Sequence, residues 1–251
     1  GVETTTGPLG QGIATAVGMA IAERMANSRL GDGLVSHRTV VIAGDGCLME
    51  GISHEAIDLA GHLGLGHLTV LWDDNGISID GSTSLTTSMN QSARFEAAGW
   101  HVVAIDGHDA DSVREALASA DADPRPSFIA CRTVIGFGSP NRSGTAAVHG
   151  APLGTDEAAA TKQCRGWTHE PFEIPDEVRE TWHAAGRRGT AARFAWQQRL
   201  DAADATPADT FAAGARWSAG ADVALIDLID RFGTERPTLA TRQSSQQVLE
   251  V

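Results

Sequence analysis

Long apolar stretches are absent from this sequence of 251 residues, and their absence limits what the protein can be. A membrane-spanning helix needs about 20 consecutive apolar residues, and the sequence shows no signal peptide pattern. Positive charge is also scarce, because 19 Lys and Arg residues face 32 Asp and Glu residues, for a net charge of −13. An acidic chain repels the phosphate backbone of nucleic acids. We therefore expect neither a membrane protein nor a nucleic-acid-binding protein.

Cysteine is rare as well, and the three present are Cys47, Cys131 and Cys164. They are widely separated and form no CxxC or Cys/His pattern, so the sequence predicts neither a disulfide framework nor a zinc site. Free thiols are typical of a reducing compartment, and we expect a cytoplasmic protein. The sequence opens on Gly1 rather than Met and closes within a helical pattern, so we expect both ends to be cut.

The sequence does contain an alternation of short apolar strands and helices. Runs of β-branched and apolar residues predict strands at 39–43, 68–72, 101–105 and 128–131. Apolar spacing predicts helices at 8–26, with Pro8 in the first helical position, and at 49–63, 92–98 and 110–120. Alternating strands and helices form right-handed crossovers, and continuously apolar strands are buried on both sides. The predicted fold class is therefore α/β, a doubly wound parallel sheet with helices on both faces.

The composition changes after about residue 150, where a helical connector is expected to follow the sheet domain. Residues 171–199 are polar with helical spacing, 201–209 are rich in Ala and Asp and predict a flexible or partly helical connector, 221–232 are amphipathic, and 238–251 begin another element. We predict a first domain at 1–203, a linker at 204–238 and the start of a second domain at 239–251.

Polar residues follow two successive predicted strands, where ligands of open parallel sheets bind. Gly44-Asp45-Gly46 comes directly after the first strand, and Asp73-Asp74-Asn75-Gly76-Ile77 after the second. Mg²⁺ prefers octahedral oxygen coordination with one or two carboxylate or amide ligands and phosphate oxygens. Asp45 offers a carboxylate, Asn75 an amide oxygen and Ile77 a backbone carbonyl. The flanking glycines allow a diphosphate to approach the backbone, and a helix beginning near Met49 would direct its amides to that anion.

Gly-Asp-Gly alone is also a common turn. The pairing of this tripeptide with Asn75 after two successive strands is more specific, and it resembles the thiamine-diphosphate-binding fold. Asp73 and Asp74 also suggest a carboxylate pair, but adjacent strand residues point to opposite faces and would not converge.

Five segments together resemble the transketolase family, over nearly residues 1–175. They are GVETTTGPLGQG at 1–12, GDGCLMEGIS at 44–53, DDNGISIDG at 73–81, GFGSPN at 136–141 and HGAPLG at 149–154. The stretch ATRQSS at 240–245 resembles the start of the family's second, pyrimidine-binding domain. The resemblance places residues 1–203 in the pyrophosphate-binding domain, without its N-terminal part.

The resemblance assigns roles to nine residues. Asp45, Asn75 and the Ile77 carbonyl would bind Mg²⁺, or Ca²⁺ or Mn²⁺, while Gly7, Pro8, Leu9, Gly46 and Asn75 would contact thiamine diphosphate. His149 would lie near the aminopyrimidine and the substrate hydroxyls and assist proton transfer, and Arg242 would bind the sugar phosphate. Each has a plainer interpretation in isolation: Gly7-Pro8 as a helix start, His149 as a surface histidine, and Arg242 as a solvated helix residue.

The family activity is the reversible transfer of a two-carbon ketol group in the pentose phosphate pathway. The donor would be xylulose 5-phosphate and the acceptor ribose 5-phosphate or erythrose 4-phosphate. The resemblance implies a homodimer with active sites between subunits. We expect this chain alone to be inactive, because the family's preceding histidines and its second-domain glutamate lie outside it. Alternatives are the cofactor-binding subunit of a split transketolase, a relative that accepts formaldehyde, and a non-catalytic binding domain.

Overall fold

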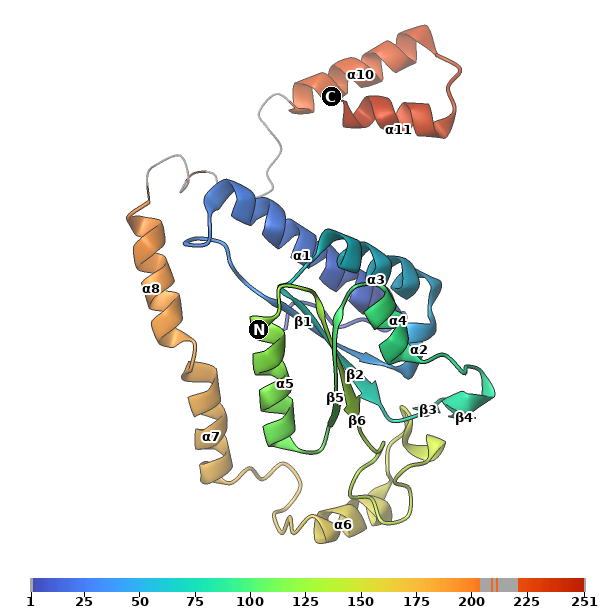
Figure 1. Ribbon diagram of the computed structural model, residues 1–251, viewed down its shortest axis with the longest axis vertical. Helices are drawn as coiled ribbons and strands as arrows, with labels where there is room; N and C mark the ends of the chain where they lie inside the picture. Colours follow the sequence, from blue (N-terminus) through green and yellow to red (C-terminus); the bar gives the residue numbers. More distant parts are fainter. Residues whose placement is uncertain (1, 204–208, 210, 212–220, 251) are drawn as a thin grey trace. The chain divides into compact units, whose positions relative to one another are not determined.

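The chain divides into two units, which meet in sequence at Trp196 and Gln197. Figure 1 shows the computed structural model, which describes residues 2–203, 209, 211 and 221–250. None of the described helices is long and apolar enough to cross a lipid bilayer.

A parallel sheet of four strands forms the centre of the first unit. Its strands lie in the order β1-β2-β6-β5. Their bounds are β1 (Thr39–Gly44), β2 (Leu68–Asp74), β5 (His101–Asp106) and β6 (Ser127–Arg132). The four predicted strands are therefore confirmed, each extended by one or two residues. Because Gly44 pairs with Asp73 in the β1–β2 register, the carboxyl ends of these neighbours lie side by side.

Helices follow the strands as predicted, but the first begins later than expected. The helices of this part are α1 (Gln11–Leu30), α2 (Asp45–Met49), α3 (Gly51–Leu63), α4 (Gln91–Ala97) and α5 (Ala110–Ala122). Gly10 precedes α1 with a φ of 82°, a left-handed conformation that cannot continue a helix backwards. Pro8 therefore does not occupy the first helical position, and that prediction is wrong.

The helix predicted at 49–63 is confirmed as α3, which begins two residues later, and a short helix that was not predicted, α2, precedes it. Glu50 has an extended backbone, with φ −68° and ψ 142°, and separates α2 from α3. The short α2 begins at Asp45 itself and ends at Met49. Asp45 therefore follows the last residue of β1 directly.

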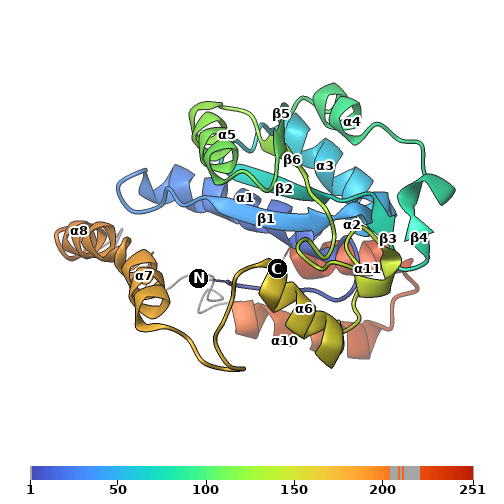
Figure 2. The same ribbon diagram turned by 90° about the horizontal axis from the view of Figure 1, so that it is seen from below.

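Two hydrophobic clusters show that both faces of the sheet are covered, as Figures 1 and 2 illustrate. Val70 and Phe128 belong to the larger cluster, with residues of α1 and α3. Their strand neighbours Leu71 and Ile129 point the other way, to the cluster formed with α5. This alternation is that of a doubly wound sheet, and it confirms the predicted fold class.

Aromatic packing fixes α4 on the larger cluster. The Phe95 ring stacks on Phe128 at 3.7 Å between centroids and meets Trp100 edge-on at 4.9 Å. All three side chains are buried, and Trp100 Nε1 donates to the Ile57 carbonyl at 2.9 Å. Full burial of a side chain of this size stabilises the fold by about 1.5–3 kcal/mol. The packing holds α3 and α4 in fixed positions relative to β6.

Short elements follow the carboxyl ends of β2 and β6. They are β3 (Ile77–Ser78), β4 (Gly81–Ser82), the 3₁₀ helices η1 (Thr83–Leu85) and η2 (Ala146–Val148), and α6 (Thr155–Cys164). Strands β3 and β4 pair antiparallel. The sequence predicted none of these elements, and they carry or flank the candidate site residues.

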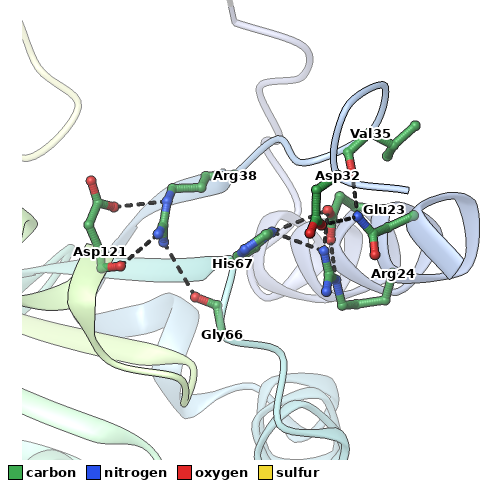
Figure 3. A network of polar contacts seen from close by, with 9 residues as sticks. Glu23, Arg24, Asp32, Val35, Arg38, Gly66, His67 and Asp121 are labelled. Atoms are coloured by element: carbon green, nitrogen blue, oxygen red, sulfur yellow. Dashed lines mark hydrogen bonds and ion pairs between the residues drawn. The ribbon is translucent and has the colours of Figure 1, made fainter. Parts of the chain in front are cut away.

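A polar network joins α1 to the amino end of the sheet (Figure 3). Glu23 of α1 is buried, and its carboxylate accepts hydrogen bonds from Nε and Nη2 of Arg24, both at 2.6 Å. His67, directly before β2, places its Nδ1 3.1 Å from Glu23 Oε1. Nearby, Arg38 donates to the Asp121 carbonyl at 2.7 Å. These contacts lie at the amino ends of the strands, opposite the carboxyl ends.

The C-terminal part is helical, as predicted. Its helices are α7 (Asp176–Arg187), α8 (Thr190–Asp201), α10 (Ala221–Glu235) and α11 (Thr241–Leu249). The helical stretch predicted at 171–199 is two helices, separated around Gly189. Most of the connector predicted at 201–209 lies outside the described residues. The helices predicted from the amphipathic run at 221–232 and from 238 onward correspond to α10 and α11.

Candidate functional site

Asp45 is a buried carboxylate at the carboxyl end of β1. It is 8% exposed, and its Oδ2 atom has no hydrogen-bond partner among the described residues. Burial raises the pKa of Asp45 to about 6, and the negative charges of Asp74 and Asp73 act in the same direction, while the Gly76 backbone amide and the Trp72 indole oppose them. A buried oxygen without a partner is costly. The Asp45 carboxylate therefore has the properties of a ligand for a cation.

Asn75 follows the end of β2, and hydrogen bonds fix its side chain. Its Nδ2 donates to Asp73 Oδ2 at 3.0 Å, and its Oδ1 accepts from the Ile77 amide at 2.9 Å. Asp73 is itself held by a hydrogen bond from the Thr133 hydroxyl, at the end of β6. The amide oxygen keeps a second lone pair. Asn75 thus offers an oriented oxygen ligand.

The fit of a divalent cation depends on the donors that this sheet edge offers. No group of three His, Cys, Asp or Glu side chains within the described part of the chain could hold a metal ion. A cation here would have to combine one carboxylate, that of Asp45, with neutral oxygens and phosphate oxygens. Mg²⁺ binds in this way, and Ca²⁺ also accepts amide and carbonyl ligands. The unpartnered Asp45 oxygen fits such an ion.

Asp73 and Asp74 diverge, as the strand geometry predicts. Asp73 supports Asn75 and Thr133, whereas Asp74 Oδ1 pairs with Arg132 Nη1 at 3.1 Å. The two carboxylates do not act on one point, and both are occupied by hydrogen bonds from neighbouring residues.

The segment before α1 packs against α2 and the start of α3. The Leu9 side chain approaches Gly46 so closely that a Cβ at Gly46 would lie 3.1 Å from Leu9 Cδ1. A Cβ at Gly10 would lie 2.7 Å from Ile52 Cγ2. Gly7 has open space around it instead. The structure therefore brings Leu9 and Gly46 together, with Gly7 and Pro8 adjoining them in sequence.

His149 and Arg242 belong to different units of the chain. His149 follows η2 and is exposed, and its amide donates to the Ala146 carbonyl at 3.0 Å. It belongs to the segment that follows β6. The first residue of this segment, Thr133, donates a hydrogen bond to Asp73. Arg242 lies in α11, in the second unit, and is exposed. The first unit therefore contains every candidate residue except Arg242, and the contacts within it join Leu9 to Gly46 and Asn75 to Ile77.

Three supporting residues of this region were not predicted from the sequence: Asp73, Thr133 and Glu157. Asp73 orients Asn75, and the Asp-Asp-Asn run could have suggested it. Thr133 contacts Asp73 from 60 residues away, and Glu157 contacts Asn141 from 16 residues away. Neither contact leaves a local signal, because it depends on how β6 and α6 pack.

Comparisons with known proteins agree on one family. A family model described as transketolase, thiamine diphosphate binding domain, matches residues 1–220. The transketolase of Cereibacter sphaeroides is 57% identical over 251 residues, which is 100% of this chain and 38% of that protein. The transketolase of Sinorhizobium medicae is 54% identical over 255 residues, which is 100% of this chain and 36% of that protein.

Solved structures give the same result. A transketolase from Leishmania mexicana superposes with a TM-score of 0.81 and 43% sequence identity, over 85% of this chain and 33% of that one. A transketolase from Campylobacter jejuni superposes with a TM-score of 0.79 and 37% identity, over 82% and 33%. The chain thus spans a little over a third of the length of the curated relatives, 38% and 36% for the two named above.

Proposed function

This chain belongs to the transketolase family, and from that premise we propose that the protein it is part of catalyses ketol transfer. The reaction would move a two-carbon ketol group reversibly from xylulose 5-phosphate to ribose 5-phosphate or erythrose 4-phosphate. Its place would be the pentose phosphate pathway, in the cytoplasm. The matched family domain binds thiamine diphosphate, which when bound supplies the stabilised carbanion that this chemistry requires.

The observation that supports this proposal most directly is the unpartnered Asp45 oxygen beside Asn75. In our proposal Asp45, Asn75 and the Ile77 carbonyl bind a divalent cation, Mg²⁺ or alternatively Ca²⁺ or Mn²⁺. The cation would neutralise Asp45 and hold the diphosphate against the end of the sheet. The orientation of Asn75 by Asp73 and Ile77 is the kind of support that metal ligands receive from their neighbours.

The remaining contacts follow from the packing at this edge. Gly7, Pro8 and Leu9 would contact the cofactor through backbone and apolar surface, and Gly46 and Asn75 would contact its diphosphate. The close approach of Leu9 to Gly46 supports a single binding surface made from both segments.

Two residues are proposed to act on the substrate. His149 would hold and move a proton near the cofactor's aminopyrimidine and the substrate hydroxyls, since a neutral imidazole both donates and accepts. Arg242 would bind the sugar phosphate, for which a guanidinium fork is suited.

A homodimer is part of the proposal. Three apolar side chains of α3 lie exposed along one side of the helix: Ile52 is 38%, Leu59 44% and Leu63 49% exposed. An apolar stripe of this kind is typical of a protein interface, and we propose that a second copy covers it. We keep the domain boundaries 1–203, 204–238 and 239–251 as proposals, and propose that this chain alone is inactive.

Calorimetry on the full-length protein tests the proposed site. Thiamine diphosphate is titrated with and without Mg²⁺ into the wild type, Asp45→Ala and Asp80→Ala. Asp80 lies in the exposed turn between β3 and β4, so its removal controls for the loss of one negative charge nearby. We expect Asp45→Ala to lose Mg²⁺-dependent binding, by at least about 100-fold in affinity, and Asp80→Ala to bind as the wild type does.

Ketol transfer is then assayed with xylulose 5-phosphate and ribose 5-phosphate. Unchanged cofactor affinity in Asp45→Ala would refute the metal site. Turnover by residues 1–251 alone would refute the proposed need for the rest of the protein.

A further inference from the structure

The chain from Thr133 to Gly154, here called the 133–154 segment, carries His149 and has no regular structure apart from η2. An exposed side chain on such a segment would ordinarily be mobile. Transfer of a proton needs a histidine that is held in place. Something must therefore fix the segment, and the proposed cofactor and metal contacts do not account for it.

Glu157, in the first turn of α6, is a buried carboxylate that the proposed site does not use. It is 9% exposed. Its Oε1 accepts from the Asn141 amide at 2.9 Å and from the Ser139 hydroxyl, and its Oε2 accepts from Asn141 Nδ2 at 2.8 Å. Hydrogen bonds from Ser139 and Asn141 hold the pKa of Glu157 at about 2. The carboxylate is therefore ionised and accepts from three donors of the segment.

These bonds join two points that are 16 residues apart in sequence, Asn141 and Glu157. His149 lies midway between them. A surface loop whose ends are held together in this way is an Ω-loop, and its tip has far fewer conformations than an open chain. Bonds to an ionised acceptor are stronger than neutral ones. Glu157 therefore closes the loop that presents His149.

Further hydrogen bonds hold the loop together nearer to His149. The Ser139 hydroxyl, 3% exposed, also accepts from the Arg142 amide at 3.3 Å. The Arg142 guanidinium reaches across to the Pro152 carbonyl at 3.4 Å. Two hydrogen-bonded pairs therefore connect the chain before His149 to the chain after it. The outer pair is Asn141 with Glu157, and the inner pair is Arg142 with Pro152.

Packing holds the tip itself. Gly136 has a φ of 65°, and a Cβ there would lie 2.9 Å from Val148 Cγ2. Val148, the neighbour of His149, therefore packs directly on the Gly136 backbone. The segment is fixed at its start by Gly136 and at its end by Glu157, and His149 lies between the two.

We infer that Glu157 is a positioning residue, which fixes His149 for the reaction by closing the loop from Asn141 to Glu157. The inference rests on the proposed role of His149. Its structural part, the closure of the loop, does not depend on that role.

A simpler explanation is that an acidic residue in the first turn of α6 only complements the helix dipole. Asp156 occupies the same turn, carries the same charge and is exposed. No side-chain hydrogen bond of Asp156 is found within the described part of the protein. A dipole effect would be shared by both residues, whereas loop closure belongs to Glu157 alone, so Asp156 is a matched control.

Amide hydrogen exchange on the full-length protein, without cofactor or substrate, tests the closure. Peptides covering residues 139–157 are compared in the wild type, Glu157→Ala, Glu157→Gln and Asp156→Ala. We expect exchange to be at least about 10-fold faster in Glu157→Ala and unchanged in Asp156→Ala, while peptides of β1 and β2 stay unchanged. Glu157→Gln should restore most of the protection, because its amide oxygen still accepts and Asn141 can turn its own amide to accept from Gln.

A double-mutant cycle tests the link to His149. We expect His149→Ala and Glu157→Ala each to lower kcat/KM for ketol transfer, by about 100-fold and about 10-fold. In the His149→Ala background, Glu157→Ala should cost less than about 2-fold. Full additivity would overturn the positioning role. Unchanged exchange in Glu157→Ala, or equal acceleration in Asp156→Ala, would overturn the closure. Faster exchange in a protein without ketol transfer would uphold the closure and refute the proposed function.

Discussion

Two buried carboxylates at opposite ends of the same sheet differ in how they are satisfied. Glu23, at the amino end, is 1% exposed and Asp45, at the carboxyl end, is 8% exposed. Glu23 is surrounded by donors, as Figure 3 shows, with Arg24 bonded to both of its oxygens and His67 beside it. Asp45 has one oxygen with no partner among the described residues.

The two pKa values move in opposite directions for this reason. Burial alone would raise the pKa of Glu23, but the hydrogen bonds from Arg24 and His67 outweigh it and the pKa is lowered. At Asp45 burial prevails, with repulsion from Asp74 added, and the pKa rises to about 6. When the partners of a buried charge belong to the fold, they offset the cost of its burial, and removing one of them leaves that charge uncompensated. A buried charge whose partners do not offset its burial costs stability, and its retention points to a ligand.

The largest expected effect comes from removing the partner of Glu23. Arg24→Ala leaves a buried carboxylate with only His67 beside it, and this should lower the free energy of unfolding by about 3 kcal/mol. That value is at the low end of the usual range, because the Arg24 side chain is 40% exposed and water can partly replace it. Urea unfolding of the full-length protein at pH 7 measures the loss.

Arg29→Ala is the matched control, because Arg29 is an exposed cation on the same helix. We expect it to cost less than about 1 kcal/mol. Cofactor affinity should be unchanged in Arg24→Ala, since Glu23 and Asp45 lie at opposite ends of the sheet. A loss no larger than that of Arg29→Ala would remove the distinction between the two carboxylates.

The opposite sign is expected at Asp45. Its pKa rises from an ordinary value of 3.8 to about 6, and each pKa unit corresponds to about 1.4 kcal/mol. Asp45→Asn should therefore stabilise the metal-free protein at pH 8 by about 2 kcal/mol, somewhat less than the roughly 3 kcal/mol of the full difference, because the new amide brings donors of its own.

The pH dependence of this gain has a fixed sign. Below pH 3.8 Asp45 is protonated in both the folded and the unfolded protein, and the substitution gains nothing. Between pH 3.8 and about 6 Asp45 is ionised in the unfolded protein but still protonated in the folded protein, so the stability gained by the substitution grows with pH in this range. Above about pH 6 Asp45 is ionised in both states and the gain is complete. Mg²⁺ with thiamine diphosphate should raise the Tm of the wild type and leave that of Asp45→Asn unchanged. A variant less stable than the wild type at pH 8 would contradict this account.

The same contrast explains how much the sequence could predict. Residues 39–43 and 68–72 gave the strands that place Asp45 and Asn75, because continuous β-branched runs are a local signal. Several partners of the buried and supporting carboxylates are not local. His67 lies 44 residues from Glu23, and Thr133 lies 60 residues from Asp73. Whether a carboxylate is satisfied or unpaired therefore emerges only when the elements pack.

Helix boundaries were missed for a different reason. A left-handed Gly10 delays α1, and an extended Glu50 divides α2 from α3. The two residues lie close together, because a Cβ at Gly10 would contact Ile52 and Glu50. Periodicity extends the first helix back to Pro8, and the close packing of Gly10 overrides it; the short α2 has too few residues for periodicity to detect.

A smaller effect is expected at Gly136, which sharpens the contrast at the carboxyl end. Gly136→Ala adds a Cβ at a φ of 65° and 2.9 Å from Val148 Cγ2. We expect a loss of about 1–2 kcal/mol in the free energy of unfolding, and a fall in kcat from displacement of His149. Gly144→Ala is the control, because its φ of 74° is similar but its nearest contact is at 3.9 Å. Equal kcat in the two variants would show that strain alone, and not the contact with Val148, is responsible.

The smallest expected loss of stability comes from removing His67, the weaker of the two partners of Glu23. Arg24 makes two contacts with Glu23 at 2.6 Å, whereas His67 makes one at 3.1 Å. His67→Ala leaves the stronger pair intact, so it should cost only about 1 kcal/mol at pH 7, against less than about 0.5 kcal/mol for the exposed His37→Ala. Because Arg24 Nη2 also lies 3.3 Å from His67 Nδ1, the effects of Arg24→Ala and His67→Ala should not be additive. Additive losses in urea unfolding would mean that His67 stabilises the sheet edge independently of the buried carboxylate.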